Sequence, residues 1–359
     1  MKKKIYIGGE YYYKPTILFK KSKFNLNNYL QKKYPNKEFT FTGGGYYSLY
    51  RIIDDIDFMD DEEILFPSYL CPTILTPFKK RNIKYKFFQV NKNLEIDIQE
   101  LKSKINRKTR AVFFINFFGF PPDEQAIEYL FSLKKSGIVL IEDCVQSFFS
   151  EINLIGDYAF NSFRKFLPLD GSVIISEHKL NTNTINLRFS MYFFYKGIGK
   201  FLRMLNIHFP IIDTSSLFLR LFKLAEDNYY KHEYVNFDFW NKYILSKLDI
   251  NFMSECREKN FNKMLHEFKE LAIINRIKEN IIPLGFPILV GNRDEFRKVL
   301  ISRKIFCPIH WKLPKEINRD EFPDSWNLSE NILTIPISEN ITSIGINYML
   351  DNLLKRVLI

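Results

Sequence analysis

A carboxylate suited to holding a buried cation lies in the segment IEDC, residues 141–144. Asp143 ends a short apolar stretch of strand type, where a carboxylate is poorly solvated unless a cation accompanies it. A protonated pyridine nitrogen is such a cation, and the pair would keep an aromatic ring able to accept electrons. Taken alone, Asp143 also fits the N-cap of a helix that follows a strand, a position that aspartate favours.

An amine with complementary chemistry ends the segment NSFRK, residues 161–165, which overlaps another strand-like stretch. Close to a cationic ring and away from bulk water, Lys165 would have a lowered pKa, so that it can form an imine with an aldehyde and later move protons. The alternative is an ordinary surface lysine. Its position after a strand end, 22 residues beyond Asp143, favours the chemical role.

The glycine run at 43–45 precedes a helical pattern that begins at Tyr46. Bare backbone amides together with the helix dipole would suit a phosphate group, although such a run is also often only a turn. Ser162 lies close to Lys165 in the sequence. It would either add a hydroxyl to the same phosphate or cap the segment that follows it.

Other catalytic arrangements find little support. The sequence has no G-x-S-x-G elbow, no P-loop and no G-x-G-x-x-G fingerprint. Its five histidines are dispersed, and its four cysteines form neither CxxC pairs nor a metal-binding spacing, so we expect reduced thiols and no metal site. No apolar stretch has the length of a transmembrane helix or of a signal-peptide core, which makes a cytoplasmic enzyme the expectation.

The chain of 359 residues carries a net charge of +11, with its basic residues mostly scattered. This charge raises the affinity for phosphates and nucleotides. Because no nucleic-acid motif is present, we expect an anionic small substrate and no nucleic-acid partner. Apolar residues make up 46% of the chain, which is enough for one large domain and a smaller one.

Residues 43–175 alternate between short apolar runs and helical patterns. The alternation predicts an α/β fold with a mostly parallel sheet covered by helices on both faces. In such sheets, ligands lie at the carboxyl ends of the strands, which is where Asp143 and Lys165 are expected. Strands are predicted at 64–66, 83–90, 111–116, 138–141, 158–163 and 172–176, and helices at 46–56, 72–80, 97–104 and 124–136.

The helical, aromatic-rich segment 180–250 lacks this alternation, and its clearest helices are at 189–205 and 217–230. It would cover the active site, form a subunit contact, or serve as a helical layer that buries its aromatic faces. We assign residues 1–250 to a large domain and residues 251–359 to a smaller C-terminal α+β domain. Within the smaller domain, a helix is predicted at 255–272 and strands at 281–290 and 332–335.

Together these pieces resemble the DegT/StrS-type sugar aminotransferases, a family that uses pyridoxal 5'-phosphate (PLP) and has the fold of aspartate aminotransferase. The pair E-D-x-x-Q and S-F-x-K at this interval is the most specific part of the resemblance. It implies a seven-stranded, mostly parallel sheet in the large domain and PLP as the cofactor. The motifs are TGGGYYSL (42–49), FPSYLCPTIL (66–75), FFGFP (117–121), IEDCVQS (141–147), GDYAFNSFRK (156–165) and LDGSVIIS (169–176).

By this resemblance, Asp143 is the partner of the pyridinium nitrogen, and Lys165 forms the imine with the cofactor aldehyde. Gln146 is expected to hydrogen-bond the phenolic oxygen of the cofactor, and Ser162 to bind its phosphate. The other expected cofactor contacts are the turn residues Gly44, Gly45 and Tyr46 and, at the ring-stacking position, Tyr69 or Cys71.

The sequence departs from the family pattern at several positions. Ser162 and Lys165 are two residues closer than usual, so the approach to the ring must differ. Tyr46 and Tyr47 replace the usual small residues and would narrow the pocket. The asparagine-arginine segment that normally reaches across the dimer is not found. Lys165 argues against the dehydratase branch of the family, which has a histidine at this position.

The resemblance implies a homodimeric, cytoplasmic aminotransferase with active sites at the subunit interface. An amino donor, expected to be glutamate, converts the cofactor to its amine form, which then aminates a ketone on a nucleotide-linked sugar for surface polysaccharide assembly. Lys165 would move the proton between cofactor and substrate. Three alternatives stay open: an aminotransferase for a small keto-phosphate or another non-nucleotide ketone, a non-catalytic relative, and a structural interaction protein.

Overall fold

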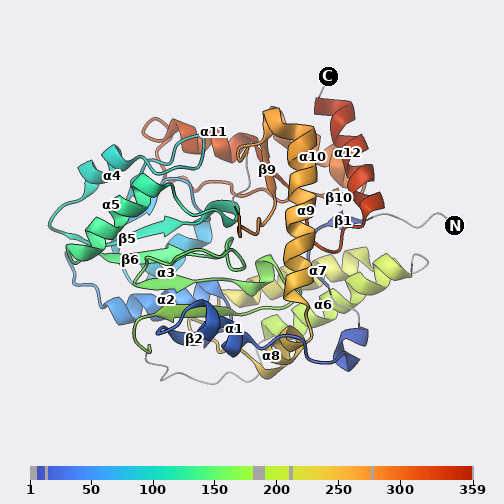
Figure 1. Cartoon of the computed structure of the whole chain (residues 1–359), viewed down its shortest axis with the longest axis horizontal. Coiled ribbons are helices and arrows are strands. Elements are labelled where there is room, and N and C mark those ends of the chain that lie inside the picture. The colour runs from blue at the N-terminus through green and yellow to red at the C-terminus, as the bar shows by residue number, and fades with distance from the viewer. Residues whose placement is uncertain (1–5, 13–14, 181–190, 210–212, 276–278, 358–359) are drawn as a thin grey trace.

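The computed structural model describes the chain except for residues 1–5, 13–14, 181–190, 210–212, 276–278 and 358–359. A seven-stranded sheet flanked by helices occupies one side of the molecule, and two short two-stranded sheets with further helices lie beside it (Figure 1). The strand order of the large sheet is β2-β8-β7-β6-β5-β3-β4. This arrangement confirms the predicted α/β fold.

The sheet is mostly parallel, because only β8 runs antiparallel to its two neighbours, β2 and β7. β2 is absent from the sequence prediction, since the alternation of Phe39 and Phe41 with polar residues spans only five residues at the sheet edge. β7 ends at Phe160, before the predicted end, because a 3-10 turn begins after Ser162. The strands are β2 (Glu38–Thr42), β3 (Glu63–Pro67), β4 (Lys84–Phe88), β5 (Thr109–Ile115), β6 (Val139–Asp143), β7 (Tyr158–Phe160) and β8 (Ser172–Ser176).

Alternate strand residues face opposite sides of the sheet, and each side has its own buried layer. On one side, Leu65 and Val112 belong to a cluster with side chains of α4 and α5. On the other side, Phe66 and Phe113 belong to a cluster with side chains of α2 and α3. These helices are α2 (Gly45–Ile56), α3 (Leu75–Lys80), α4 (Ile98–Lys104) and α5 (Glu124–Lys135).

Four helices begin directly after an aspartate. The side chains of Asp97, Asp123, Asp238 and Asp249 each accept a hydrogen bond from a backbone N–H in the first turn, at 3.0, 2.9, 2.9 and 3.2 Å. Such caps satisfy amides that have no partner inside the helix. The cap at Asp249 explains why α9 (Ile250–Phe268) begins before the predicted residue 255.

The C-terminal part contains the two short sheets. β9 pairs with β11 in antiparallel fashion, and β10 pairs in parallel with β1 from the other end of the chain. Ile7 of β1 shares a buried cluster with Leu300 and Met349. The division of the chain at residue 250 stays a prediction. The elements are β1 (Ile7–Gly8), β9 (Phe286–Leu289), α10 (Arg293–Ser302), β10 (Ile305–Phe306), α11 (Pro323–Asn331), β11 (Ile332–Ile335) and α12 (Ser343–Val357).

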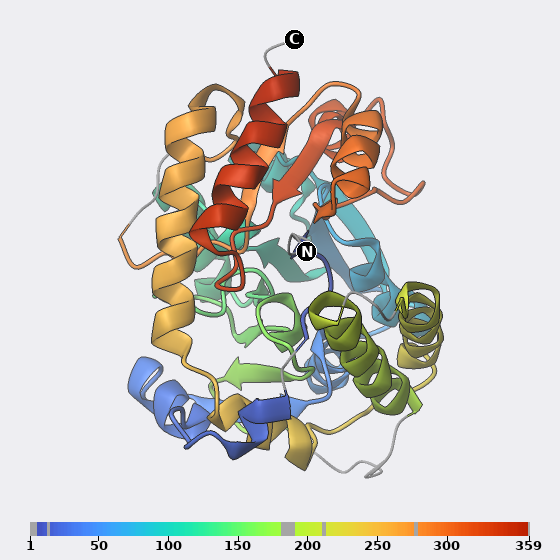
Figure 2. The ribbon, with the colours of Figure 1, turned by 90° about the vertical axis from the view of Figure 1, so that its right-hand side faces the viewer.

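Helices α6 (Met191–His208) and α7 (Ser215–Tyr229) pack side by side beyond the edge of the large sheet (Figures 1 and 2). The predicted start of the first helix at residue 189 lies outside the described residues. The alternative in which this segment buries aromatic faces holds for Tyr192 of α6, which packs in a buried cluster with Tyr229 of α7. The opposite face of α6 departs from it, because Phe194 and Phe201 are exposed. The remaining α-helices are α1 (Leu26–Lys33) and α8 (Phe239–Ser246).

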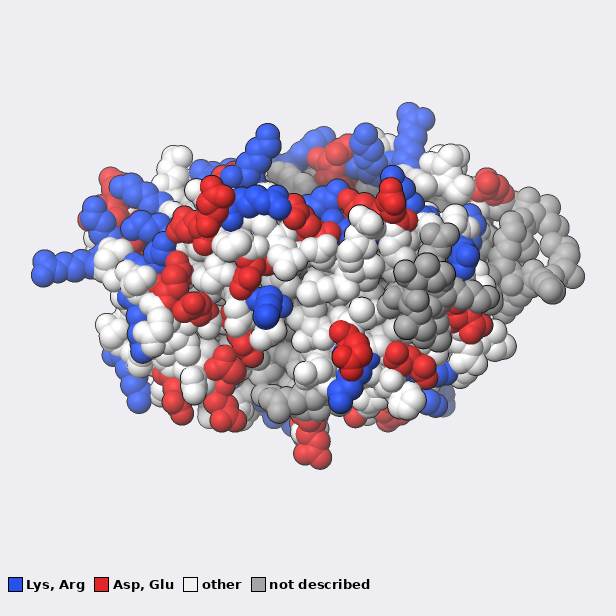
Figure 3. Space-filling model, turned by 90° about the horizontal axis from the view of Figure 1, so that it is seen from above, with Lys and Arg blue, Asp and Glu red and all other residues white. Residues whose placement is uncertain are grey.

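Charged residues of both signs are mixed on the upper face of the molecule (Figure 3). Seen from above, Lys and Arg alternate with Asp and Glu, so the net charge of +11 is not gathered into one patch on this face (Figure 3). Within the part of the chain that the structure describes, no helix combines the length and the hydropathy needed to cross a bilayer.

Candidate active site

The carboxyl ends of β5, β6 and β7 meet at one edge of the sheet. There Asp143 lies in register with Ile115 on one side and Phe160 on the other. A narrow cavity of about 80 Å³ opens at this point, and Asp143 and Lys165 both line it. The carboxylate and the amine singled out from the sequence therefore share one site.

The Asp143 carboxylate is buried and has few protein partners. Its Oδ1 accepts a hydrogen bond from the Val145 N–H at 2.8 Å, and because no helix begins after it, the helix-cap alternative is wrong. The adjacent Glu142, in contrast, accepts hydrogen bonds from the Asn116 side chain and from two backbone N–H groups, at 2.9–3.0 Å. Burial raises the pKa of Asp143 to about 7, against the opposing effects of Val145 and Lys165. A cationic partner would keep this carboxylate ionised.

Lys165 ends a 3-10 turn that begins directly after Ser162. This tight turn accommodates the short spacing between the serine and the lysine. Burial lowers the pKa of Lys165; the Asp143 carboxylate opposes this shift, and the Arg164 guanidinium adds to it. The neutral amine, which attacks an aldehyde, is therefore available at a lower pH than in an exposed lysine.

The beginning of α2 forms another part of the cavity wall. Gly45 and Tyr46 line the cavity together with Ser162, and Gly44 is the N-cap residue. A Cβ at Gly45 would lie 3.1 Å from the Asn161 carbonyl oxygen, so glycine lets the helix start close to the end of β7. The Ser162 side chain does not cap the turn that follows it. Its hydroxyl and the first amides of α2 are arranged to suit an anion.

Gln146 holds an amide donor without a partner. Its Oε1 accepts a hydrogen bond from the Phe118 N–H at 2.6 Å, whereas its Nε2 is buried and unpaired among the described residues. Leaving a buried donor unpaired costs about 1–3 kcal/mol. Because Gln146 lines the cavity, a ligand oxygen there would satisfy this donor.

The two ring-stacking candidates lie in different places. Cys71 lines the cavity, whereas Tyr69 is fully buried and is not among the lining residues. The Tyr69 hydroxyl donates a hydrogen bond to the His310 carbonyl oxygen, and its ring centre lies 5.5 Å from that of Trp311. Trp311 itself lines the cavity, although nothing in the sequence singles it out.

Three further lining residues have no signal in the sequence: Arg164, Tyr229 and Tyr230. The two tyrosines lie at the end of α7, so part of the segment 180–250 covers the site, which is one of the three alternatives for it. The Arg164 guanidinium lies 4.7 Å from the centre of the Tyr229 ring and donates to both carboxylate oxygens of Glu226, at 3.1 and 3.3 Å.

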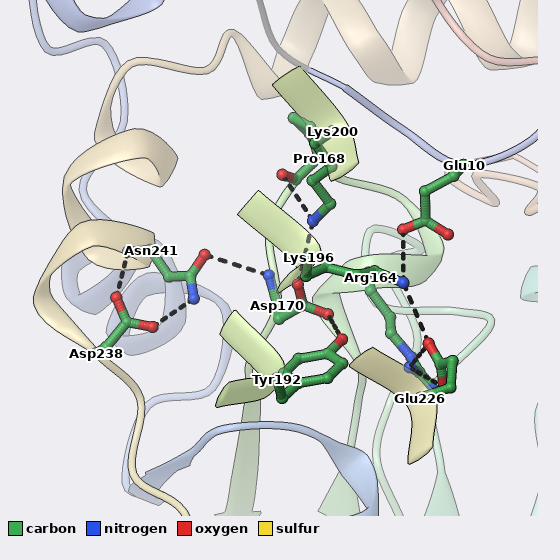
Figure 4. Close-up of polar contacts among 10 residues, drawn as sticks. All are labelled: Glu10, Arg164, Pro168, Asp170, Tyr192, Lys196, Lys200, Glu226, Asp238 and Asn241. Carbon is green, nitrogen blue, oxygen red and sulfur yellow. Dashed lines mark hydrogen bonds and ion pairs between the residues drawn. The ribbon is translucent and has the colours of Figure 1, made fainter. Parts of the chain in front are cut away.

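Buried ion pairs connect the lysines of α6 to α7, to the N-terminal segment and to the loop that follows Lys165 (Figure 4). Lys196 Nζ lies 3.1 Å from both Glu10 and Glu226, and Lys200 Nζ lies 3.1 Å from Asp170 Oδ2. Burial alone would raise the pKa of Asp170, but the two lysines and a neighbouring arginine lower it to about 2. Asp170 therefore stays ionised inside the protein.

Replacing Asp170 with asparagine is expected to lower the free energy of unfolding by about 3–5 kcal/mol, because Lys200 becomes an unpaired buried charge. The folded pKa of Asp170 lies below its unfolded value of about 3.9. Its stabilisation is thus complete above that value and is lost as the pH falls towards about 2. Urea unfolding at pH 7 and pH 3 should show the difference from wild type shrinking at the lower pH.

The matched control is Asp249→Asn. It removes the charge from an exposed ion pair with Lys23 and keeps an oxygen for the helix cap. We expect little change in this variant. Equal losses of stability in the two variants would contradict the role given to Asp170.

Residues 53–166 match the family described as the DegT/DnrJ/EryC1/StrS aminotransferase family. Among curated proteins, GDP-perosamine synthase of Escherichia coli O157:H7 is 20% identical over 73% of this chain and 70% of that protein. The GDP-4-keto-6-deoxy-D-mannose 3-dehydratase of Yersinia pseudotuberculosis is 26% identical over 33% of this chain. The matched part spans only 32% of the dehydratase.

Solved structures share the fold at low sequence identity. A DegT DnrJ EryC1 StrS aminotransferase from Brucella abortus superposes with a TM-score of 0.67 and 14% identity over 97% of this chain and 91% of that one. PseC, an aminotransferase of Helicobacter pylori, gives 0.69 and 13% over 96% and 95%. Spr1654 from Streptococcus pneumoniae in its PLP form also gives 0.69 and 13%, over 96% and 91%. The family match confirms the resemblance, and these structures confirm the fold.

Proposed function

We propose that this chain, which matches the DegT/DnrJ/EryC1/StrS aminotransferase family at residues 53–166, is a PLP-dependent aminotransferase that converts a nucleotide-linked keto sugar to an amino sugar. The observation that carries the proposal is one cavity lined by a carboxylate, a lysine, an unpaired amide and a helix N-terminus. Relatives named GDP-perosamine synthase and dTDP-3-amino-3,6-dideoxy-alpha-D-galactopyranose transaminase support the substrate class. A dehydratase is also related, but Lys165 favours amino transfer.

The lining residues fit PLP at each of its ends. Asp143, which has one protein hydrogen bond, would pair with the ring nitrogen, and the unpaired Nε2 of Gln146 would donate to the phenolic oxygen. Ser162 and the start of α2 at Gly45 would bind the phosphate. Ligand pockets rarely fall below roughly 300 Å³. We therefore expect closing side chains such as Tyr230 to move when the cofactor enters.

The chain's own residues would serve three tasks around the cofactor. Bound PLP supplies an aldehyde and an electron sink. Lys165 would hold the aldehyde and, once released by the donor amine, carry a proton to and from the substrate carbon. Asp143 would keep the ring nitrogen protonated, and Tyr229 and Trp311 would exclude water from the site.

A second, larger cavity of about 740 Å³ adjoins the first, and Arg164 and Lys165 line both. Its walls come from the N-terminal segment 8–12, from α6 and α7, and from the C-terminal part of the chain. The volume lies well inside the range of roughly 300–1,000 Å³ that ligand pockets span. It suits a nucleotide-linked sugar better than it suits a small keto-phosphate.

Arg203 of α6 is a buried cation in the wall of this larger cavity. Its Nη2 donates to the Gly8 carbonyl at 2.9 Å and its Nε has no partner, and no ion pair of Arg203 occurs among the described residues. Burial lowers its pKa, against the opposing effect of Glu10. A buried cation in this state is suited to an anion, so we assign Arg203 to a phosphate of the substrate.

The function is tested by following the two half-reactions by absorbance. Glutamate should convert the PLP-loaded enzyme to its amine form, and GDP-4-keto-6-deoxy-D-mannose should convert it back. If only small keto-phosphates converted the amine form back to the PLP form, the substrate would belong to that class instead. Failure of the purified protein to bind PLP would contradict an aminotransferase and favour a non-catalytic relative.

The variant Arg203→Gln is expected to raise the KM for a nucleotide-linked keto sugar by roughly 10- to 100-fold, the loss of one charge-assisted hydrogen bond. The half-reaction with glutamate should keep its rate, because this donor carries no phosphate. Arg319→Gln is the control, since Arg319 forms an exposed ion pair with Glu330. An unchanged KM, or an equal loss in both half-reactions, would exclude the assigned role of Arg203.

We further propose that the enzyme is a cytoplasmic homodimer that serves surface polysaccharide assembly. The aminotransferase match and the nucleotide-sugar relatives support this assignment. Size measurement of the purified protein tests the oligomeric state independently of its activity.

A further inference from the structure

Helix α6 exposes one apolar face, while its buried residues include three cations, Lys196, Lys200 and Arg203. The apolar side chains Met191, Phe194, Ile198 and Phe201 are 37–49% exposed, although large apolar residues usually face the core. Their spacing of three and four residues places them on one face of the helix. Phe209, directly after the helix, continues the same line and is 52% exposed. We call these five residues the α6 stripe.

The charged face of α6 points inward and holds the helix in this orientation. Lys200 pairs with Asp170, and these side chains are only 5% and 4% exposed. Lys196 pairs with Glu10 and Glu226 (Figure 4). Rotating α6 to bury the stripe would break these buried pairs, so the apolar face must stay outward.

A glycine beside the stripe has no explanation within one chain. Glycine inside a helix costs about 1 kcal/mol relative to alanine. At Gly199 the reason is clear, because a Cβ there would lie 2.6 Å from the Phe222 ring. At Gly197 a Cβ would meet no atom within 4 Å. A glycine in such a place allows a second helix to approach closely.

The burial of the charged side chains on α6 favours a second copy of this chain over a lipid surface as the partner of the α6 stripe. Helices that lie on membranes carry exposed Lys and Arg on their polar face, whereas Lys196, Lys200 and Arg203 of α6 are all buried. A net charge of +11 opposes self-association, so a contact between copies is best placed on a face that exposes apolar side chains and no cation. The described part of α6 offers such a face, because every exposed residue on it is apolar.

The stripe is large enough to form the centre of an interface. With roughly 200 Å² for a large apolar side chain, the five residues expose roughly 450 Å² of apolar surface. A stable interface buries about 800 Å² on each partner, with an apolar centre and a polar rim. The stripe would supply the centre, and its neighbours on α6 and α7 would supply the rim.

We propose that α6 packs against α6 of a second copy across a two-fold axis, with the α6 stripe at the centre and Gly197 at the closest approach. This inference rests on the homodimer proposed above and specifies its surface. Because Arg203 of α6 lines the substrate cavity, the interface would hold this part of the cavity wall in place.

The test is sedimentation velocity on the PLP-loaded protein over about 1–100 μM, a range that covers typical dimer affinities. Phe194→Glu places two carboxylates in a self-complementary contact and should weaken dimerisation by roughly 100-fold or more. Gly197→Leu should weaken it as well, while its thermal unfolding stays near that of wild type. The matched control is Phe131→Glu on α5, because Phe131 is 44% exposed and Phe194 is 43% exposed.

Dissociation in both α6 variants, with an intact dimer in Phe131→Glu, is the expected result. A dimer that survives both α6 substitutions overturns the proposed surface and leaves the homodimer standing. A wild-type protein that stays monomeric overturns both. Monomers that float with phosphatidylglycerol vesicles, and lose this binding in Phe194→Glu, would replace the second copy with a lipid surface. None of these outcomes depends on catalysis, so the aminotransferase proposal is tested separately.

Discussion

Lys165→Ala is expected to lower the rate of amino transfer by roughly 10⁴-fold or more, because the variant loses both the group that holds the aldehyde and the proton carrier. The fold should be kept, since Lys165 lies at the end of a short turn in the cavity wall and takes part in no ion pair among the described residues. The measurement is the single-turnover rate of each half-reaction, together with the absorbance of the protein loaded with PLP.

Two further observations separate the chemical role of Lys165 from a structural one. A small amine added to the buffer should restore part of the lost rate, because it can replace the missing proton carrier. Lys135→Ala, which removes an exposed lysine from the end of α5, should leave both half-reactions unchanged. A Lys165→Ala protein that still turned over at a tenth of the wild-type rate would exclude the assigned role.

The positions of Asp143 and Lys165 could be predicted because each follows a strand of the same sheet. Short apolar runs specify such strands locally, and the parallel arrangement brings their carboxyl ends together. The sequence order alone therefore places a carboxylate and an amine at one edge, as the register of β6 with β7 now shows. β2 escaped prediction because it is an edge strand of five residues with only weak alternation.

The cover of the site could not be predicted in the same way. Tyr229 and Trp311 lie far along the chain from Lys165, and only tertiary packing brings them to the cavity. The orientation of α6 was equally hidden, because hydrophobic periodicity shows which residues share a face and assumes that the apolar one is buried. Buried partners such as Asp170 reverse this assumption here.

Asp143→Asn is expected to lower turnover by roughly 10²- to 10⁴-fold, which corresponds to the 3–5 kcal/mol of a broken buried charge pair. Asparagine keeps an oxygen for the Val145 N–H, so the local turn should survive. A neutral amide cannot stabilise a protonated ring nitrogen, so the loss should fall on the chemical step and on PLP affinity. Asp143→Ala should lose turnover to a similar extent and, in addition, lose the turn.

The thermal stability of the cofactor-free protein provides a second test of Asp143, because the substitution that lowers turnover should raise this stability. Burial raises the pKa of Asp143 to about 7, so the folded protein binds a proton more tightly than the unfolded chain. The carboxylate therefore destabilises the cofactor-free fold increasingly as the pH rises from about 4 to about 7. Asp143→Asn should be more stable than wild type at pH 8 and equal to it near pH 4, as measured by thermal unfolding.

Substitution of the adjacent carboxylate, Glu142, should instead lower stability while it largely spares turnover. Glu142 accepts hydrogen bonds from the Asn116 side chain and from the N–H groups of Ile155 and Gly156, so Glu142→Gln places an amide donor against donors and should cost stability more than turnover. If Asp143→Asn instead kept its turnover, or lost stability in parallel with Glu142→Gln, then Asp143 would be a structural residue. The cavity would then lack the partner that a cationic ring requires, because no other carboxylate among the described residues lines it.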